Sequence, residues 1–286
     1  DGSKNDFSYI CCNPIASIEL KNNKLISQFP DGSSELEEVD LNMNIPERIH
    51  QFSKQFKSKS FPFKFISTGI FGYIGHDAVD RFENIELDKK KPGNDIPDIY
   101  YAVYQNIIAI SLFNHEAHLF SHIYNGDHNL NDVEALLTAK KNSHFNFKKV
   151  GGKSSNLSDE QFIEFVKKGK DHCYRGDVFQ LVLSRRFSQG FKGDEFNVYR
   201  TLRSINPSPY LFFFDYGYFR IFGSSPEAQL IVQDSKAEIH PIAGTFRRTG
   251  DDEKDSKAAE ALAKDPKENS EHVMLVDLAR NDLSRN

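Results

Sequence analysis

The stretch "YLFFFDYGYFRIFG" (210–223) decides the fold class of this chain. Its two apolar runs, joined by a short turn, are typical of neighbouring strands. "EAQLIV" (227–232) and "AEIHPIAGT" (237–245) follow, so that four strands succeed one another without a helix between them. Strands joined by short turns pair antiparallel, whereas a parallel sheet needs long crossovers. We therefore predict an α+β fold in which antiparallel sheets pack face to face and are flanked by helices.

The first part of the chain is also rich in expected strands. Short strands are expected at 7–12, 16–20 and 24–29, a strand leading into a helix within 67–79, a hairpin of 99–113 with 116–124, and a helix at 129–141. The stretch "KKVGGKSSN" (148–156) is rich in Lys, Gly and Ser and is typical of a linker. We expect one domain over 1–147, a linker over 148–157 and a second domain over 158–286.

The second domain is expected to begin with a helix. Ser158 and Gln161 form an S-x-x-Q capping box, apolar residues then recur at helical spacing, and Gly176 ends the pattern. A strand is expected at 177–187, and a second helix at 194–205 before the "NPSP" turn.

The chain closes on another predicted helix with a clear start. Asp265 is a good N-cap, Pro266 suits the first helical position, and Glu268 completes a D-x-x-E capping arrangement. We expect Glu268 to lie near the helix-start amides, which explains it as a structural residue.

Glu271 lies one turn further along this helix, on a stripe with Leu275 and Leu278. A carboxylate on an apolar stripe has to be paired, bound to a metal or perturbed in its pKa. His272 lies on the neighbouring face, where a hydrogen-bonded structural histidine is expected. Glu271 is therefore the candidate functional residue of the three.

Composition excludes several classes of function. The net charge is -5 and the pI is near 6.1, without the basic stripe of a nucleic-acid surface. No apolar run approaches the roughly 20 residues that cross a bilayer. Three cysteines without C-x-x-C spacing indicate a reducing, cytoplasmic location. The chain begins without Met and ends inside a sequence pattern, which indicates a piece that is incomplete at both ends.

Four stretches in this order resemble the chorismate-binding enzymes, and within them the component I (large subunit) group of anthranilate synthases. They are "GDVFQLVLSRRF" (176–187), "NPSPYLFFF" (206–214), "FGSSPEAQL" (222–230) and "PIAGTFRRTG…DPKENSEHVMLVDLARNDL" (241–283). Each motif alone is weak, and the ordered set is specific. The resemblance is strong over 155–286.

The remainder resembles the N-terminal domain of the same group more loosely, through "FSYICCNPIASIEL" (7–20) and "GIFGYIGHDAV" (69–79). By this resemblance, 1–147 is that N-terminal domain without its first strands, and 158–286 is the N-terminal half of the chorismate-binding domain. The family's second magnesium ligand and its catalytic histidine have no counterpart in this sequence.

The resemblance implies the site residues. Glu227 matches the general acid that protonates the departing C4 hydroxyl of chorismate. Such an acid is needed because hydroxide is a poor leaving group unless it is protonated as it departs. By itself Glu227 would be interpreted as an exposed surface carboxylate. Gly244 and Thr245 match the chorismate-binding turn, and Glu271 matches a ligand of Mg²⁺, which prefers hard oxygen donors. Glu268 is then a candidate to orient a metal-bound water.

Two positions indicate the reaction. Relatives that add water at C2 carry a lysine base where this chain has Gln180, and relatives that aminate C4 usually carry lysine where it has Ala243. The resemblance thus implies a lyase that converts chorismate and ammonia, or glutamine through a partner amidotransferase subunit, to anthranilate and pyruvate in tryptophan biosynthesis. An aminodeoxychorismate synthase component I is the alternative enzyme.

The "NPSPY" stretch resembles the element through which this group binds tryptophan as a feedback inhibitor. Pro209, Tyr210 and Leu211 are the matching contact positions. A Pro-flanked aromatic segment is also typical of a packed turn. A non-catalytic tryptophan-binding piece of the enzyme therefore stays open as a third interpretation.

Overall fold

The computed structural model describes residues 7–40, 43–59, 62–63, 65–85, 87, 95–126, 130–139 and 146–285. The chain divides into two compact units, Asp1–Asn142 and Ser143–Asn286. Strand pairing in both units is antiparallel throughout the described residues. The predicted α+β class with antiparallel sheets and helices is confirmed.

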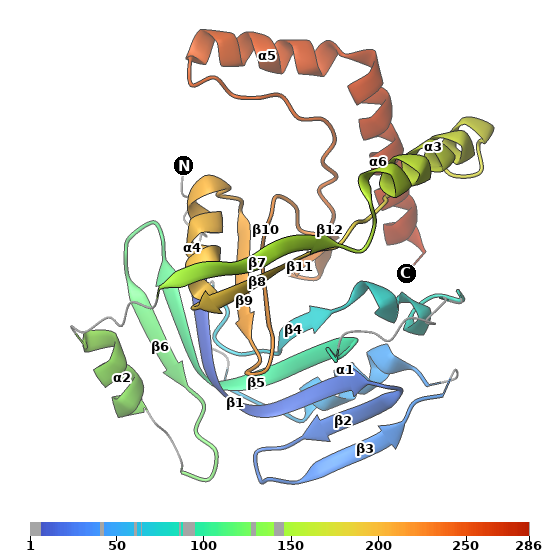
Figure 1. Cartoon of the computed structure of the whole chain (residues 1–286). Helices are drawn as coiled ribbons and strands as arrows, with labels where there is room; N and C mark the ends of the chain where they lie inside the picture. The colour runs from blue at the N-terminus through green and yellow to red at the C-terminus, as the bar shows by residue number, and fades with distance from the viewer. Residues whose placement is uncertain are drawn as a thin grey trace. The chain divides into compact units, whose positions relative to one another are not determined.

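Unit 1 is built on one six-stranded sheet (Figure 1). The strands are β1 (Phe7–Lys21), β2 (Lys24–Gln28), β3 (Ser34–Glu38), β4 (Phe71–Ile74), β5 (Ile99–Ser111) and β6 (Ala117–Ser121). Their order is β3-β2-β1-β5-β4, with β6 also paired to β5. The hairpin predicted for 99–124 is confirmed. The strands expected at 7–12 and 16–20 form one long strand, whose register with β5 shifts between Pro14 and Ala16.

The helical elements of unit 1 are α1 (Ile45–Lys54), the 3-10 helix η1 (His76–Arg81) and α2 (Leu130–Thr138). Helix α1 was not predicted, although Asn44 caps it by accepting a hydrogen bond from the Glu47 amide. The unit has a continuous apolar core, in which Ile18, Ile45 and Ile99 are at most 1% exposed. Burial of this kind is the main stabilising contribution in a globular unit.

The described residues of unit 2 form three two-stranded antiparallel sheets. The strands are β7 (Phe147–Ser155) with β8 (Phe187–Gly193), β9 (Tyr210–Asp215) with β10 (Arg220–Ser225), and β11 (Ile231–Gln233) with β12 (Lys236–Glu238). The segment expected as a linker, 148–156, runs largely as strand β7 and pairs with β8. The strands expected at 227–232 and 237–245 are reduced to the short β11 and β12.

The strand predicted at 177–187 is wrong, because regular strand structure begins only at Phe187. Residues 177–186 have no ladder partner among the described residues, and a strand requires one for its backbone groups. Leu181 and Leu183 instead pack on helix α3 (Asp159–Arg175): a Cβ added to Gly169 would lie 2.9 Å from Leu181 Cδ2. The predicted ends of α3 are confirmed, with both capping-box bonds at Ser158 and Gly176 at φ 78°.

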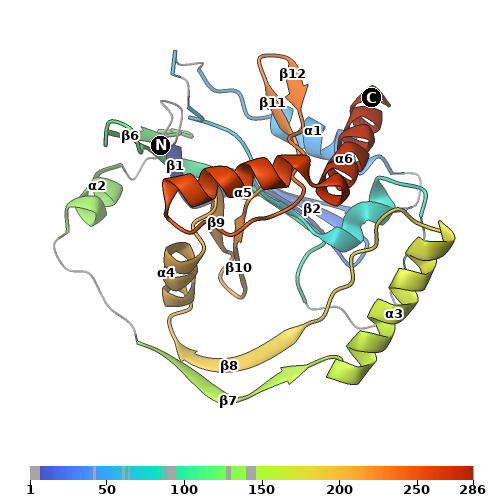
Figure 2. The same cartoon turned by 90° about the horizontal axis from the view of Figure 1, so that it is seen from above.

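Helix α4 (Phe196–Ile205) packs on the hairpin of β9 and β10. The rings of Phe196 and Phe213 meet edge to face at 5.0 Å, and Arg220 Nε lies 2.6 Å from Glu195 Oε1. Helices α5 (Asp252–Lys264) and α6 (Pro266–Ser284) meet in a sharp bend (Figures 1 and 2). The start of α6 is as predicted, whereas α5 was not predicted.

Burial differs sharply between the two units. In unit 2, Gly169 alone is buried among the described residues, and large apolar side chains such as Phe179 (92%) and Val182 (86%) are exposed. Within the part of the chain that the structure describes, no helix is long and apolar enough to cross a membrane.

Candidate functional site

Gly244 and Thr245 lie in an irregular segment, 239–249, that follows β12. Gly244 has φ 73°, in the left-handed region that favours glycine. A Cβ at this position would lie 2.5 Å from Glu268 Oε2 and 3.2 Å from Leu262 Cδ1. The left-handed conformation therefore favours glycine here, and a larger residue would displace the Glu268 carboxylate. Thr245 is exposed.

The carboxylate against Gly244 belongs to Glu268 and not to Glu271. Asp265 Oδ1 caps α6 by accepting from the amides of Lys267 at 2.9 Å and Glu268 at 3.1 Å. Because Asp265 satisfies these amides, the Glu268 side chain is available to reach Gly244. Glu268 lies in the first turn of α6, as expected, and its carboxylate is directed at Gly244. Glu271 is half-buried one turn further along α6, and its predicted role stays a prediction.

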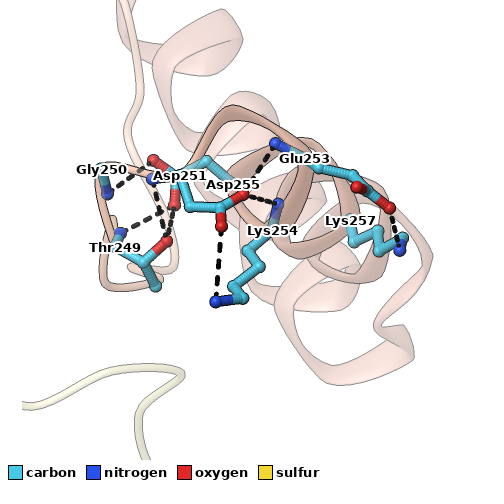
Figure 3. A network of polar contacts seen from close by, with 7 residues as sticks. All are labelled: Thr249, Gly250, Asp251, Glu253, Lys254, Asp255 and Lys257. Atoms are coloured by element: carbon cyan, nitrogen blue, oxygen red, sulfur yellow. Dashed lines mark hydrogen bonds and ion pairs between the residues drawn. The ribbon is translucent and has the colours of Figure 1, made fainter.

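A polar network fixes the chain at Thr249 and Gly250, before helix α5 (Figure 3). Asp255 on α5 accepts from the Thr249 amide at 2.7 Å, from the Thr249 hydroxyl at 2.8 Å and from the Gly250 amide at 3.3 Å. These hydrogen bonds, first from the Thr249 backbone and then from its hydroxyl, hold the pKa of Asp255 below its usual range. Asp251 caps α5 through the amides of Glu253 and Lys254.

Glu227 is exposed and lies just beyond the end of β10. Its backbone is held by Ser225, whose Oγ donates to the Glu227 carbonyl at 2.9 Å and accepts from the Glu227 amide at 3.3 Å. A hydroxyl that bonds the backbone two residues on is a common turn device. The side chain of Glu227 therefore starts from a fixed backbone position.

The residues expected to contact tryptophan lie beside this turn. Tyr210 and Leu211 open β9, and their register partners on β10 are Ser225 and Ser224. Tyr210 is 44% exposed, and Pro209 is exposed directly before the strand. The hairpin thus places the predicted inhibitor positions across from the residues that precede Glu227.

The described residues hold no group of three His, Cys, Asp or Glu side chains that could bind a metal ion. Glu268 and Glu271 are three residues apart on α6, so they lie on neighbouring positions of one helix surface. Their carboxylates are the hard oxygen donors that Mg²⁺ prefers, and Mg²⁺ usually takes only one or two of these together with waters and substrate oxygens. The donor chemistry fits magnesium.

Three features of the site were missed in the sequence. The contact of Glu268 with Gly244 joins residues 24 positions apart, which no local pattern reveals. The serine turn at Glu227 could have been found, because Ser225 followed by Pro226 is a turn signal. Helix α5, which carries Asp255, had a detectable N-cap in Asp251.

Comparison with known proteins gives the family of this antiparallel α+β chain, in which a glycine turn lies against the Glu268 carboxylate of helix α6. The family of chorismate binding enzymes matches residues 1–286. The chain belongs to this family.

Individual relatives show which members of the family this chain is similar to. The chain is 32% identical to anthranilate synthase component 1 of Acetivibrio thermocellus over 98% of its length. It is also 32% identical to that of Lactococcus lactis over 100% of its length. It resembles the crystal structure of anthranilate synthase component I from Streptococcus pneumoniae with a TM-score of 0.76 and 28% identity, over 98% of this chain. The chain spans 59%, 63% and 62% of these relatives, respectively.

Proposed function

We propose that this chain is the corresponding part of an anthranilate synthase large subunit, which forms anthranilate and pyruvate from chorismate and ammonia. The observation that carries the proposal is the Gly244 turn, which faces a carboxylate of the helix that also bears Glu271. The family and the names of the similar proteins support it.

In the proposed reaction, ammonia attacks C2 of chorismate, both ring double bonds shift (C1=C2 to C1=C6, and C5=C6 to C4=C5), and the C4–O bond breaks. Glu227 donates a proton to the departing C4 oxygen, which leaves as water, and the added nitrogen loses a proton. Loss of the C2 proton and of the C3 enolpyruvyl group then gives anthranilate and pyruvate. Thr245 offers a backbone amide and a hydroxyl to a substrate carboxylate, and the bare Cα of Gly244 allows a close approach.

Magnesium would be held by Glu271, with Glu268 beside it. When bound, the cation would neutralise carboxylate charge on the substrate and stabilise charge that develops during the reaction.

Amination at C2 is proposed over the two nearest alternatives. Gln180 is a neutral amide that cannot take a proton from water, whereas ammonia is already nucleophilic. Ala243 stands where relatives that aminate C4 usually carry lysine. An aminodeoxychorismate synthase would differ in the position of the amino group on its product.

The test is anthranilate fluorescence with chorismate, Mg²⁺ and ammonium, measured on the complete gene product. We expect turnover in the wild type and a loss of ~10²–10⁴-fold in Glu227→Gln, because an amide of the same size cannot donate the proton. Product identity by mass spectrometry and NMR separates anthranilate from aminodeoxychorismate. Near-wild-type turnover of Glu227→Gln would remove Glu227 from the mechanism.

We also propose that a glutamine amidotransferase subunit supplies ammonia and that tryptophan inhibits through Pro209, Tyr210 and Leu211. Ligand binding to the native state raises its melting temperature by mass action. We expect tryptophan to stabilise the complete gene product and Tyr210→Ala to weaken this effect. An unchanged shift in the variant would leave "NPSPY" as a packed turn.

A further inference from the structure

Two adjacent serines end strand β10, and their hydroxyls have different partners. Ser224 Oγ donates to the Asn206 carbonyl at 2.6 Å, directly after α4. Ser225 Oγ donates to the Glu227 carbonyl and accepts from the Glu227 amide. Successive residues of a strand face opposite sides of the sheet, so neighbouring serines can serve separate contacts. Ser224 holds the hairpin to the α4 turn, and Ser225 holds Glu227.

The residue between Ser225 and Glu227 limits how Glu227 can be oriented. Pro226 has no amide hydrogen and a φ fixed near -65°. One oxygen atom, Ser225 Oγ, binds both backbone polar groups of Glu227 on the far side of this proline. With both groups held, the direction of the Cα–Cβ bond of Glu227 is set by the end of β10.

This orientation matters for proton transfer. A general acid has to reach its acceptor within about 2.6–3.2 Å, and a misplacement of about 1 Å can lower the rate by ~10²-fold. The Glu227 side chain is exposed, and no side-chain hydrogen bond to it is found among the described residues. The hydrogen bonds that position Glu227 are therefore those between its backbone and Ser225.

We propose that Ser225 is the positioning residue of Glu227, and that its hydroxyl aims the carboxyl group at the departing oxygen. This inference rests on the proposed function, in which Glu227 is the general acid. The register adds a second consequence, because Tyr210 is the partner of Ser225 on β9. A change in the strand pair at Tyr210 would therefore act on Ser225, which holds the backbone of Glu227.

The experiment compares Ser225→Ala, Ser225→Thr and the matched control Ser224→Ala in the complete gene product. We expect Ser225→Ala to lower kcat about 10-fold or more and to leave KM for chorismate within about twofold, since substrate binding is not altered. Ser225→Thr keeps the hydroxyl and should restore most of kcat. Ser224→Ala loses its bond to Asn206 and should keep kcat within about twofold of wild type.

A double-mutant cycle separates positioning from stability. If Ser225 acts only through Glu227, adding Ser225→Ala to Glu227→Gln should lower kcat no further. Equal losses of kcat in Ser225→Ala and Ser224→Ala, or additive losses in the cycle, would overturn the inference while Glu227 keeps its role. Full activity of Glu227→Gln would remove Glu227 from the mechanism and overturn this inference with it, whereas a wild type that forms no anthranilate would overturn the proposed function.

Discussion

Glycine at position 244 does two things that no other residue can do at once. It adopts φ 73°, and it leaves room for Glu268 Oε2 at a distance that a Cβ would not tolerate. The clashing atom is the end of a flexible side chain, so it can move away. The consequence of a larger residue is therefore a displaced carboxylate rather than an unfolded protein.

The variants Gly244→Ala and Gly250→Ala together test whether a larger residue at position 244 acts by displacing the Glu268 carboxylate. Gly250 has φ 81° and no atom within 4 Å of an added Cβ, so its variant carries the backbone strain alone. We expect both variants to lose about 1–2 kcal/mol of stability, the usual cost of a left-handed conformation. Only Gly244→Ala should lose most anthranilate formation. Urea denaturation and the fluorescence assay on the complete gene product check this; equal activity losses would contradict it.

Asp255 gives a pH-dependent prediction at the same scale. Its pKa is lowered in the folded protein by hydrogen bonds from Thr249, so its ionised form stabilises the fold. This contribution is present above the ordinary Asp pKa of about 3.9 and is lost as the pH falls through the lower folded pKa. The stability difference between wild type and Asp255→Asn should therefore shrink in acid, as measured by denaturation at several pH values.

The control for Asp255→Asn is Asp252→Asn, which removes the same charge from the first turn of α5. Asp252 accepts no hydrogen bond from the 249–250 turn among the described contacts. A pH dependence of equal size in both variants would indicate general charge effects at the helix N-terminus instead of the Thr249 contacts.

At the scale of elements, one arginine joins three pieces of unit 2. Arg185 donates to Ser155 Oγ at the end of β7, to the Leu157 carbonyl before α3, and to Asp159 Oδ1 in its first turn. Its guanidinium also lies 4.7 Å from the centroid of the Phe187 ring at the start of β8. The side chain is only 16% exposed, so these contacts are partly shielded from water.

Arg185→Ala should destabilise unit 2 by roughly 2–3 kcal/mol, since hydrogen bonds to charged groups contribute the most. Arg185→Lys should recover little, because an ammonium cannot reproduce the planar fork. Arg186→Ala is the matched control and should change stability by less than about 0.5 kcal/mol, because its side chain is exposed. Chemical denaturation measures all three. A large loss in Arg186→Ala would indicate that the segment as a whole is sensitive.

At the scale of the whole molecule, the two units differ in the interactions that stabilise each of them internally. Unit 1 has strands paired on both sides and a buried apolar core. Unit 2 has two-stranded sheets, which are stabilised by contacts between aromatic rings, by ion pairs and by helix caps. Only one of its described residues is buried. An isolated hairpin is marginally stable in water, so local opening should be easier in unit 2.

Hydrogen exchange of this 286-residue chain, followed by mass spectrometry, tests that difference. We expect amides of β5, which pairs with β1 on one side and with β4 and β6 on the other, to exchange far more slowly than amides of β9. Protection in β9 equal to that in β5 would contradict the expectation. Peptides from α1 and α4 provide the same comparison for helices.

The features that the sequence determined by itself involve residues close to one another along the chain. The capping box of Ser158 and Gln161, the Gly176 stop and the Asp265 cap were predictable, because each involves residues within one helical turn. Hairpins such as β9–β10 were predictable for the same reason, as their partners follow one another. The ordered motifs also sufficed to indicate the family.

Only the tertiary structure decided the contacts between distant segments. The segment expected as a linker forms most of strand β7, because it pairs with β8. Strand β8 begins 32 positions after β7 ends. The alternating run 177–186 packs on α3 instead of joining a sheet, since alternation gives a segment two faces but no partner. Glu268 lies against Gly244, a contact between residues 24 positions apart that no local pattern reveals.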